Sequence, residues 1–380
     1  MPAVIDQKAG KNRQVPNEDR TSSRIEILRF PLIVGVVFIH NYATAVNQLE
    51  GPTGIMNDPA WVQFIRLFVS EGLATIAVPL FFVISGYLFF VGGWGWGKYT
   101  DKLHRRMHTL LIPYLFWNLL ALAVFAAAQR IPSLRFAAFS TRFPPIHSFT
   151  PFDYVNAVFG LTSNYPISAQ FWFIRDLMAL LVLAQVIHFL LWRRLALPFI
   201  AVLFGLWFFK IWPLLWPSVD ATFFFSLGAF LALPGKNLEY LDKFGTWICA
   251  AFLGLLILHS AFPEDTLYLG RLVIMVGVPC AWFLARLVAG SVKLKARMVA
   301  LGGASFFVFA AHQPLLTILI RIVYKLLHPS GGLALLGLFF AVPVCLIVVL
   351  LLIHMLLMRG LPRFTGFITG SAYRTKRALA

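Results

Sequence analysis

Charged side chains are scarce in this 380-residue chain. Asp, Glu, Lys and Arg make up 12% of the residues, whereas 59% are hydrophobic. A soluble domain carries about 25% charged residues, so this chain has too little polar surface to cover a soluble core. The same apolar excess excludes an intrinsically disordered chain. The composition therefore indicates a protein embedded in a membrane.

Cysteine is almost absent, and the familiar catalytic motifs are missing. The three cysteines, Cys249, Cys280 and Cys345, lie inside apolar runs and form no CxxC pair, so we expect small core residues and no disulfide. The sequence contains no HExxH, no GxSxG, no GxGxxG, no Walker motif and no fixed-period repeat. These absences argue against a zinc site or any other metal site, a serine hydrolase and a nucleotide-binding fold.

Long apolar segments dominate the rest of the chain. A helix needs about 20 apolar residues to cross about 30 Å of hydrocarbon, so we expect an all-α polytopic membrane protein with about ten transmembrane helices. A Trp- and Pro-rich turn separates the fifth segment from the sixth, and 151–160 is expected to form a short interfacial helix. The ten expected spans cover 25–46, 64–91, 107–128, 170–192, 195–214, 219–234, 244–262, 267–289, 299–326 and 333–358.

The basic residues are distributed unevenly between the two sides of these spans. The formal net charge is +17, and 22 of the 32 Lys and Arg fall in the two tails and in alternate loops, against four in the other loops. By the positive-inside rule both termini are cytoplasmic. We therefore expect a polar cytoplasmic tail at 1–23, a membrane domain at 24–359 and a basic cytoplasmic tail at 360–380. The basic ring suits anionic membrane lipid or a phosphorylated substrate, and no nucleic acid is needed to explain it.

Two ionisable residues lie in the first apolar segment. Arg29 and His40 are 11 residues apart, which places them on one helix face about 16 Å apart along the axis. Ionisable groups inside a span are costly and mark functional sites, and a buried imidazole can accept a proton from a hydroxyl. The structural alternative is an Arg29 that snorkels to the headgroups and a His40 that only hydrogen-bonds a neighbouring helix.

Two further segments offer candidate binding groups. Ser85 and Tyr87 belong to FFVISGY at 81–87, where Ser and Gly favour close helix packing and Tyr87 could donate a hydroxyl. Arg105 and Arg106 belong to a basic cluster at the next cytoplasmic loop. Their forked donors fit phosphate oxygens, and the alternative is a purely topological cluster of charge.

Later apolar runs hold four further candidates for substrate or donor binding, which are Trp172, Arg175, Asp176 and His312. Trp172 suits a membrane-interface belt, and the adjacent Arg175 and Asp176 either hold each other or line a cavity. His312 lies mid-span, two residues before Pro314, which frees backbone groups locally. The structural alternative for His312 is a histidine satisfied within helix packing.

Taken in order, these segments resemble the membrane-bound acyltransferase 3 family of bacterial O-acyltransferases. The resemblance covers nearly the whole chain after the tail. The matching segments are RIEILRF at 24–30 with His40-Asn41, FFVISGYLFF at 81–90, KLHRRMHTLLIPYLFW at 102–117, FWFIRDL at 171–177, FFFSLGAFLA at 223–232 and ASFFVFAAHQPLL at 304–316.

The resemblance implies a ten-helix enzyme of the bacterial inner membrane. Such an enzyme moves an acyl group, here expected to be acetyl, from cytoplasmic acyl-CoA to a hydroxyl of a surface or exported polysaccharide. The implied partners are acyl-CoA as co-substrate and a glycan or lipid-linked saccharide as acceptor, with no bound cofactor and no attached SGNH domain. Arg29 and His40 match the catalytic first-helix residues of the family, and Arg106 matches one Arg of its second-loop motif, whereas Thr109 replaces another.

The resemblance also implies roles for these residues. His40 is expected to act as general base for the acceptor hydroxyl or to carry the acyl group itself. The donor nucleotide is expected at Arg105 and Arg106, and Ser85, Tyr87 and Arg175 are candidate oxyanion donors. The competing function is a polytopic glycan exporter or flippase that performs no covalent chemistry.

Overall fold

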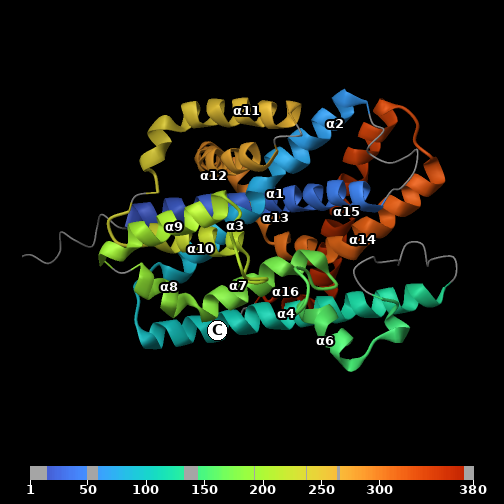
Figure 1. Cartoon of the computed structure of the whole chain (residues 1–380), viewed down its shortest axis with the longest axis horizontal. Helices are drawn as coiled ribbons and strands as arrows, with labels where there is room; N and C mark the ends of the chain where they lie inside the picture. Colours follow the sequence, from blue (N-terminus) through green and yellow to red (C-terminus); the bar gives the residue numbers. More distant parts are fainter. Residues whose placement is uncertain are drawn as a thin grey trace, which may run out of the picture.

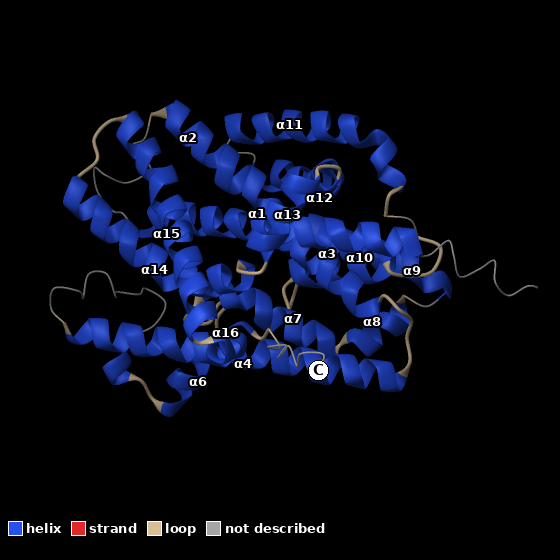
Figure 2. Ribbon diagram, turned by 180° about the vertical axis from the view of Figure 1, so that it is seen from behind, coloured by secondary structure: helices blue, strands red, loops and turns tan. Residues whose placement is uncertain are grey.

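The computed structural model describes residues 15–48, 59–131, 144–191, 193–236, 238–262 and 266–371. Within these ranges the regular structure is helical, with no strand (Figures 1 and 2). The helices are α1 (Val15–Gln48), α2 (Ala60–Arg66), α3 (Ala77–Phe90), α4 (Trp96–Arg130), α6 (Pro151–Phe159), α7 (Trp172–Val182), α8 (Ala184–Leu190), α9 (Ala196–Phe208), α10 (Val219–Leu231), α11 (Gly245–Ala261), α12 (Thr266–Ala289), α13 (Val292–Gly302), α14 (Ser305–Leu327), α15 (Gly332–Gly360) and α16 (Pro362–Thr369).

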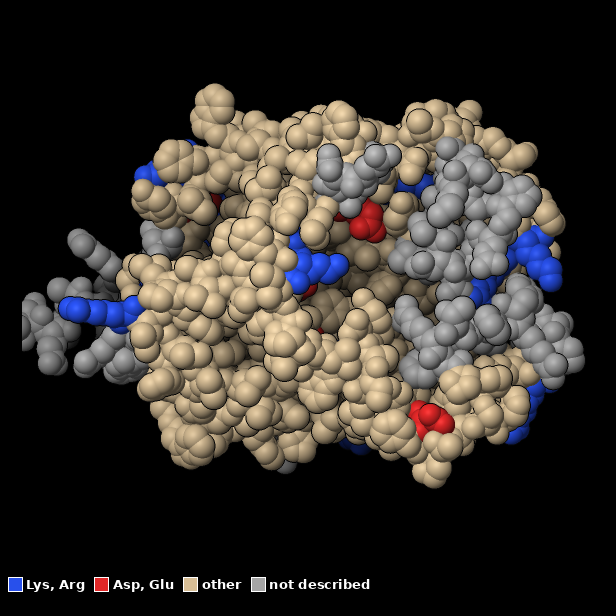
Figure 3. Space-filling model, in the orientation of Figure 1, with Lys and Arg blue, Asp and Glu red and all other residues tan. Residues whose placement is uncertain are grey.

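The multi-pass, all-helical architecture expected from the sequence is confirmed for the described residues. Six helices are long and apolar enough to cross a membrane: Ala60–Phe90, Trp96–Arg130, Tyr240–Ala261, Leu267–Ala289, Ser305–Leu327 and Gly332–Gly360. Helices α7 and α8 would form a seventh span, bent by 62°. Most of the face seen in Figure 3 is uncharged, as a surface in contact with lipid requires.

The expected spans at 195–214 and 219–234 are shorter in the structure. Helices α9 and α10 have 13 residues each, or about 20 Å of helix, less than the hydrocarbon thickness. The turn between them holds Trp212, whose indole Nε1 donates to the carbonyl of Pro217 at 2.9 Å. Hydropathy therefore located two apolar helices but overestimated their lengths.

Three boundaries differ from the expected domains. Helix α1 begins at Val15, inside the expected tail. The basic α13 has no buried residue and ends at Gly302, so it is separate from α14. Helix α16 lies in the expected C-terminal tail, where Thr365 and Ile368 are buried, and the indole of Trp117 on α4 donates to the Ile368 carbonyl at 2.8 Å.

Two glycines allow α3 and α10 to pack backbone to backbone. A Cβ atom on Gly86 would lie 2.0 Å from the Phe225 carbonyl oxygen, and one on Gly228 would lie 2.0 Å from that of Val83. Small residues at such crossings permit close approach of helices in membranes. The glycine of the FFVISGY segment is therefore a packing residue, as the packing interpretation predicts.

Cysteines occupy two different environments. Cys280 on α12 is buried and its sulfur lies 2.8 Å from that of the half-buried Cys249 on α11. Cys345 on α15 is exposed, so the expectation that all three are core residues is wrong for this one. In a bilayer an apolar run can face lipid instead of the protein interior, which explains the difference.

The expected interfacial helix at 151–160 is present as α6. Thr150 and Asp153 form a reciprocal capping box at its start, with the Thr150 N–H and hydroxyl donating to the Asp153 carboxylate at 2.8 and 2.7 Å. These two hydrogen bonds lower the pKa of Asp153. Gly160 ends the helix in the left-handed region, at φ 61°.

Candidate active site

His40 lies on a firmly held stretch of α1. The hydroxyl of Ser70 donates to the Phe38 carbonyl at 2.9 Å, and the Asn41 amide donates to the Phe339 carbonyl on α15 at 3.0 Å. The rings of Phe38 and Phe339 also meet edge to face, with centroids 5.6 Å apart. These contacts on both sides of His40 fix the helix that carries it.

The structure brings His40 and His312 together. Their ring centroids are 5.1 Å apart and the ring planes are inclined by 47°. His40 is half-buried on α1, and His312 on α14 is fully buried. Two histidines that are far apart in the sequence therefore form one imidazole pair inside the helical assembly.

One hydrogen bond determines the tautomer of His312. Its Nδ1 lies 2.7 Å from the Phe309 carbonyl oxygen. A carbonyl oxygen only accepts, so Nδ1 must carry the proton of the neutral ring. The other nitrogen, Nε2, is buried and has no hydrogen-bond partner, which makes it a proton acceptor in the neutral ring.

A break in α14 follows directly after His312. Gln313 has non-helical φ and ψ of −107° and 140°, and Pro314 comes next. The Gln170 side-chain amide donates to the carbonyls of Ala310, at 3.1 Å, and Gln313, at 3.4 Å. The sequence interpretation anticipated the opening at Pro314 but missed Gln170, although an amide at the start of an apolar span could have indicated it.

Arg29 lies at the opposite end of this face of α1 from His40. Its side chain is exposed and lies within electrostatic range of Arg106 on α4. The structure therefore brings together the first-helix Arg and the Arg of the second-loop segment. Arg106 belongs to the basic residues that the positive-inside rule assigns to one membrane surface, which we call the basic face, and Arg29 lies near it. The basic face includes Arg20, Arg24, Lys102, Arg105, Arg106, Lys243, Arg286, Lys293, Lys295 and Arg297.

A cavity of about 340 Å³ opens beside Arg105 and Arg106; we call it the arginine cavity. It is also lined by Leu88, Phe89, Lys102 and Thr109. Lys102 donates to the carbonyls of Phe89 and Val91 at 2.7 and 2.9 Å, so it caps the end of α3. The two arginines are therefore the cations best placed to bind a ligand here.

Trp172, Arg175 and Asp176 line a second cavity, of about 520 Å³, which we call the outer cavity. Ile39 also lines it, which places it beside His40 on α1. Other polar lining residues are Asn164, Lys210, Ser218, Asp220 and Arg271.

Arg175 and Asp176 both hold each other and line the outer cavity. The Arg175 guanidinium donates to one Asp176 carboxylate oxygen at 3.1 Å. It also donates to the carbonyls of Phe159, at the end of α6, and of Gly160 and Asn164, in the loop after it. The other Asp176 oxygen accepts the Ser218 N–H at 2.7 Å. This pair therefore builds the cavity wall out of two separate loops, and both of the alternatives considered from the sequence apply.

Ser85 and Tyr87 lie away from the imidazole pair. Gly35 on α1 packs against Ala77 at the start of α3. From Ala77, Tyr87 lies about 15 Å along α3 toward the basic face. From Gly35, His40 lies about 7 Å along α1 in the opposite direction. Tyr87 lines an apolar pocket instead. Among the described residues, no three His, Cys, Asp or Glu side chains gather into a group that could hold a metal ion.

Comparison with known proteins identifies the family of this chain. A family model described as an acyltransferase domain matches residues 22–354. The chain is 29% identical over 369 residues to the succinoglycan biosynthesis protein ExoH of Rhizobium meliloti (strain 1021), with 94% of each chain covered. No solved structure matches the chain. The chain therefore belongs to this acyltransferase family, and it is a multi-pass membrane enzyme that transfers acyl groups other than amino-acyl groups.

Proposed function

We propose that this enzyme transfers an acyl group from acyl-CoA to a hydroxyl of an exopolysaccharide in the bacterial inner membrane. The observation that carries the proposal is the pair formed by His40 and His312. The name of the relative, a succinoglycan biosynthesis protein, supports an exopolysaccharide as the acceptor. The acyl group we expect is acetyl, with succinyl as the alternative.

The charge distribution supports cytoplasmic delivery of the donor. The basic face lies at the cytoplasm by the positive-inside rule, with both termini on that side. The arginine cavity offers Arg105 and Arg106 for the phosphates of the donor. Arg29 lies near Arg106 and adds a third cation on the same side.

The imidazole pair supplies the proton transfer. His312 donates Nδ1–H to a backbone carbonyl, which fixes its ring against that of His40. His40 takes the proton of the acceptor hydroxyl while the hydroxyl oxygen attacks the thioester carbonyl. The new C–O bond forms, the C–S bond breaks, and the CoA thiolate leaves and takes up the proton. In the alternative route His40 carries the acyl group covalently before the hydroxyl attacks.

The test uses purified protein in lipid nanodiscs with labelled acyl-CoA and acceptor glycan. We expect label in the glycan, and His40→Ala should lower the rate by about 10²–10⁴-fold. His147→Ala, in an exposed loop, is the matched control and should retain full activity.

Two outcomes contradict the proposal. The first is full glycan acylation by a correctly inserted His40→Ala variant. The second is transport of unmodified glycan across the membrane without incorporation of label, which identifies an exporter instead. Mass spectrometry of the product reads the acyl group directly, because acetyl and succinyl differ in mass.

A further inference from the structure

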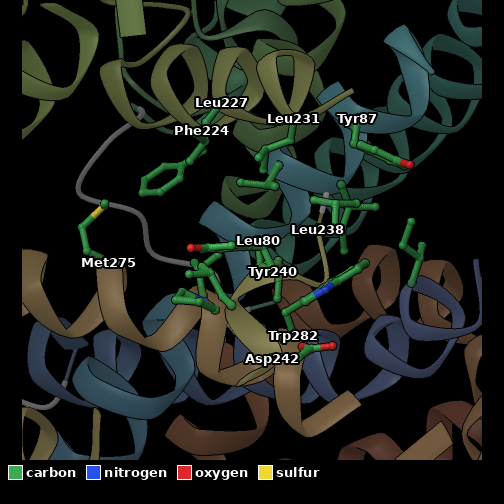
Figure 4. Close-up of a pocket in the computed structure, with 16 residues that line it drawn as sticks. Leu80, Tyr87, Phe224, Leu227, Leu231, Leu238, Tyr240, Asp242, Met275 and Trp282 are labelled. Atoms are coloured by element: carbon green, nitrogen blue, oxygen red, sulfur yellow. The ribbon is translucent and has the colours of Figure 1, made fainter. Parts of the chain in front are cut away.

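An apolar pocket of about 330 Å³ lies between α3, α10 and α12 (Figure 4). Neither His40 nor His312 lines it. Its volume lies within the roughly 300–1,000 Å³ range of ligand sites. Leu80, Phe224, Leu227, Leu231 and Met275 form much of its wall. A long hydrocarbon chain is the chemistry that suits such a lining.

One part of the pocket lining consists of residues typical of the membrane interface. It includes Tyr240 and Leu241, which belong to the short helix η8 (Tyr240–Phe244). Tyr240 is 60% exposed and Phe244 is 47% exposed, and Lys243 lies over both rings, at 3.9 and 5.0 Å. Exposed aromatic rings combined with Lys are typical of the headgroup level of a bilayer. This part of the pocket therefore suits the level of the lipid headgroups.

A cavity of about 820 Å³ adjoins the pocket on the basic face; we call it the basic cavity. Asp242 belongs to the lining of both. Arg24 bonds both carboxylate oxygens of Asp242, at 3.0 and 2.6 Å, and lies 3.7 Å from Glu239. The two carboxylates are thus engaged within the wall. Two more basic side chains of the lining also approach these carboxylates: Arg20 lies 3.6 Å from Glu239 and Arg286 lies 3.7 Å from Asp242. With Lys243 and Lys295, five basic residues line the cavity against two acidic ones, which gives a local excess of positive charge.

An indole N–H lies between the charged and apolar regions. Trp282 lines the pocket, and its Nε1 is buried without a hydrogen-bond partner. The Arg24 guanidinium lies 5.3 Å from the centre of the Trp282 ring, which places the ring beside the basic cavity. A buried donor of this kind needs an acceptor, and an ester carbonyl would supply one.

We propose that these regions form a binding site for an anionic phospholipid. Its phosphate binds in the basic cavity near Lys243 and Arg286, and its ester carbonyl accepts the Trp282 N–H. One of its acyl chains fills the apolar pocket. The order of phosphate, ester and hydrocarbon in the lipid matches the order of cations, indole donor and apolar wall in the protein. Anionic lipids are also attracted to clustered Lys and Arg at the cytoplasmic surface.

The experiment measures lipid retention by native mass spectrometry. Protein from nanodiscs with equal phosphatidylglycerol and phosphatidylcholine should retain one phosphatidylglycerol. Arg286→Ala should weaken retention about fivefold, because a surface cation contributes about that factor. Arg297→Ala, an exposed residue of the same face, is the matched control and should retain the lipid. Equal retention of both lipids by the wild-type protein overturns the proposal.

A second measurement uses the wild-type protein alone, so a folding defect cannot obscure it. Phosphatidylglycerol with a photoactivatable group in its acyl chain should label the peptides that contain Met275 or Leu227. Labelling confined to lipid-facing positions such as Val348 overturns the proposal. Loss of labelling when CoA is added before photolysis, but not when unlabelled phosphatidylglycerol is added, also overturns it, because the site then binds the soluble nucleotide. This readout requires no acyl transfer, so its failure is distinguishable from failure of the proposed enzymatic function.

Discussion

At the scale of single residues, His312 is the group whose chemistry the structure defines best. Its tautomer follows from one carbonyl contact, and its ring lies against His40. Its Nε2 is buried without a partner. Under the proposed function, we expect His312 to hold His40 in the orientation that its proton transfer requires.

We expect His312→Asn to lower kcat by about 10²-fold, the effect of a small misplacement of a catalytic group. The KM for acyl-CoA should stay unchanged, because the basic face remains intact. Steady-state kinetics in nanodiscs measures both constants, with His147→Asn as the control. An unchanged kcat would show that the ring contact has no part in catalysis.

Asp153 provides a prediction about pH. Hydrogen bonds from Thr150 lower the pKa of its carboxyl, so the cap stabilises α6 above the unfolded pKa of about 3.9. This stabilisation is lost as the pH falls through the lower, folded pKa. Hydrogen exchange of the peptide covering α6 should therefore be slower in wild type than in Asp153→Ala at pH 6. A difference that persisted unchanged at pH 2 would contradict the capping role.

The sequence predicted some of these residues and not their partners. Helical spacing alone placed Arg29 and His40 on one face, because that depends only on helix geometry. The contact with His312 and the role of Gln170 depend on how α1, α7 and α14 pack. No local pattern in one segment encodes a contact with a distant one, so these could not be predicted.

At the scale of elements, the close crossing of α3 and α10 can be tested by a glycine substitution. We expect Gly228→Ala to destabilise the protein by about 1–3 kcal/mol, the usual effect of overpacking. The new methyl group would meet the Val83 carbonyl, which is backbone and cannot rotate away. Thermal unfolding in detergent measures the change.

The matched control for this substitution is Gly205→Ala on α9. No atom lies within 4 Å of a Cβ built there. Alanine is favoured over glycine inside a helix by about 1 kcal/mol, so this variant should be neutral or more stable. Equal unfolding temperatures for the two variants would argue against the close α3–α10 contact.

Helix ends were harder to predict than helix existence. The apolar runs correctly predicted the helices α9, α10 and α14. Hydropathy does not show where the backbone turns, so it did not predict where these helices begin and end. The boundary between α13 and α14 depends on a turn at Gly303 and Ala304 and on a basic α13 that has no buried residue. The bend of 62° between α7 and α8 likewise occurs inside one continuous apolar run.

At the scale of the whole molecule, composition was sufficient to predict a multi-pass, all-α membrane protein. Its sidedness is a separate expectation that rests on the distribution of Lys and Arg. The three cavities could not be predicted from the sequence. Each is lined by at least two separate segments and exists only once the chain has folded.

Cysteine labelling in cells tests the sidedness. In a background without native cysteines, Thr162→Cys in the loop after α6 should react with a membrane-impermeant thiol reagent added outside. Arg297→Cys on the basic face should react only after the membrane is opened. Both side chains are exposed, so their reaction with the reagent depends only on the side of the membrane on which each residue lies. The opposite pattern would invert the topology and, with it, the direction of donor delivery.

The packing of α16 has a practical consequence for work on this protein. The segment docks on α4 through Trp117. Gly370, at φ 64°, lies so close to the Thr109 carbonyl that a side chain there would collide with it. Thr109 also lines the arginine cavity. Shortening the chain at residue 361 would remove the helix that packs against this side of the arginine cavity, so affinity tags belong beyond residue 371.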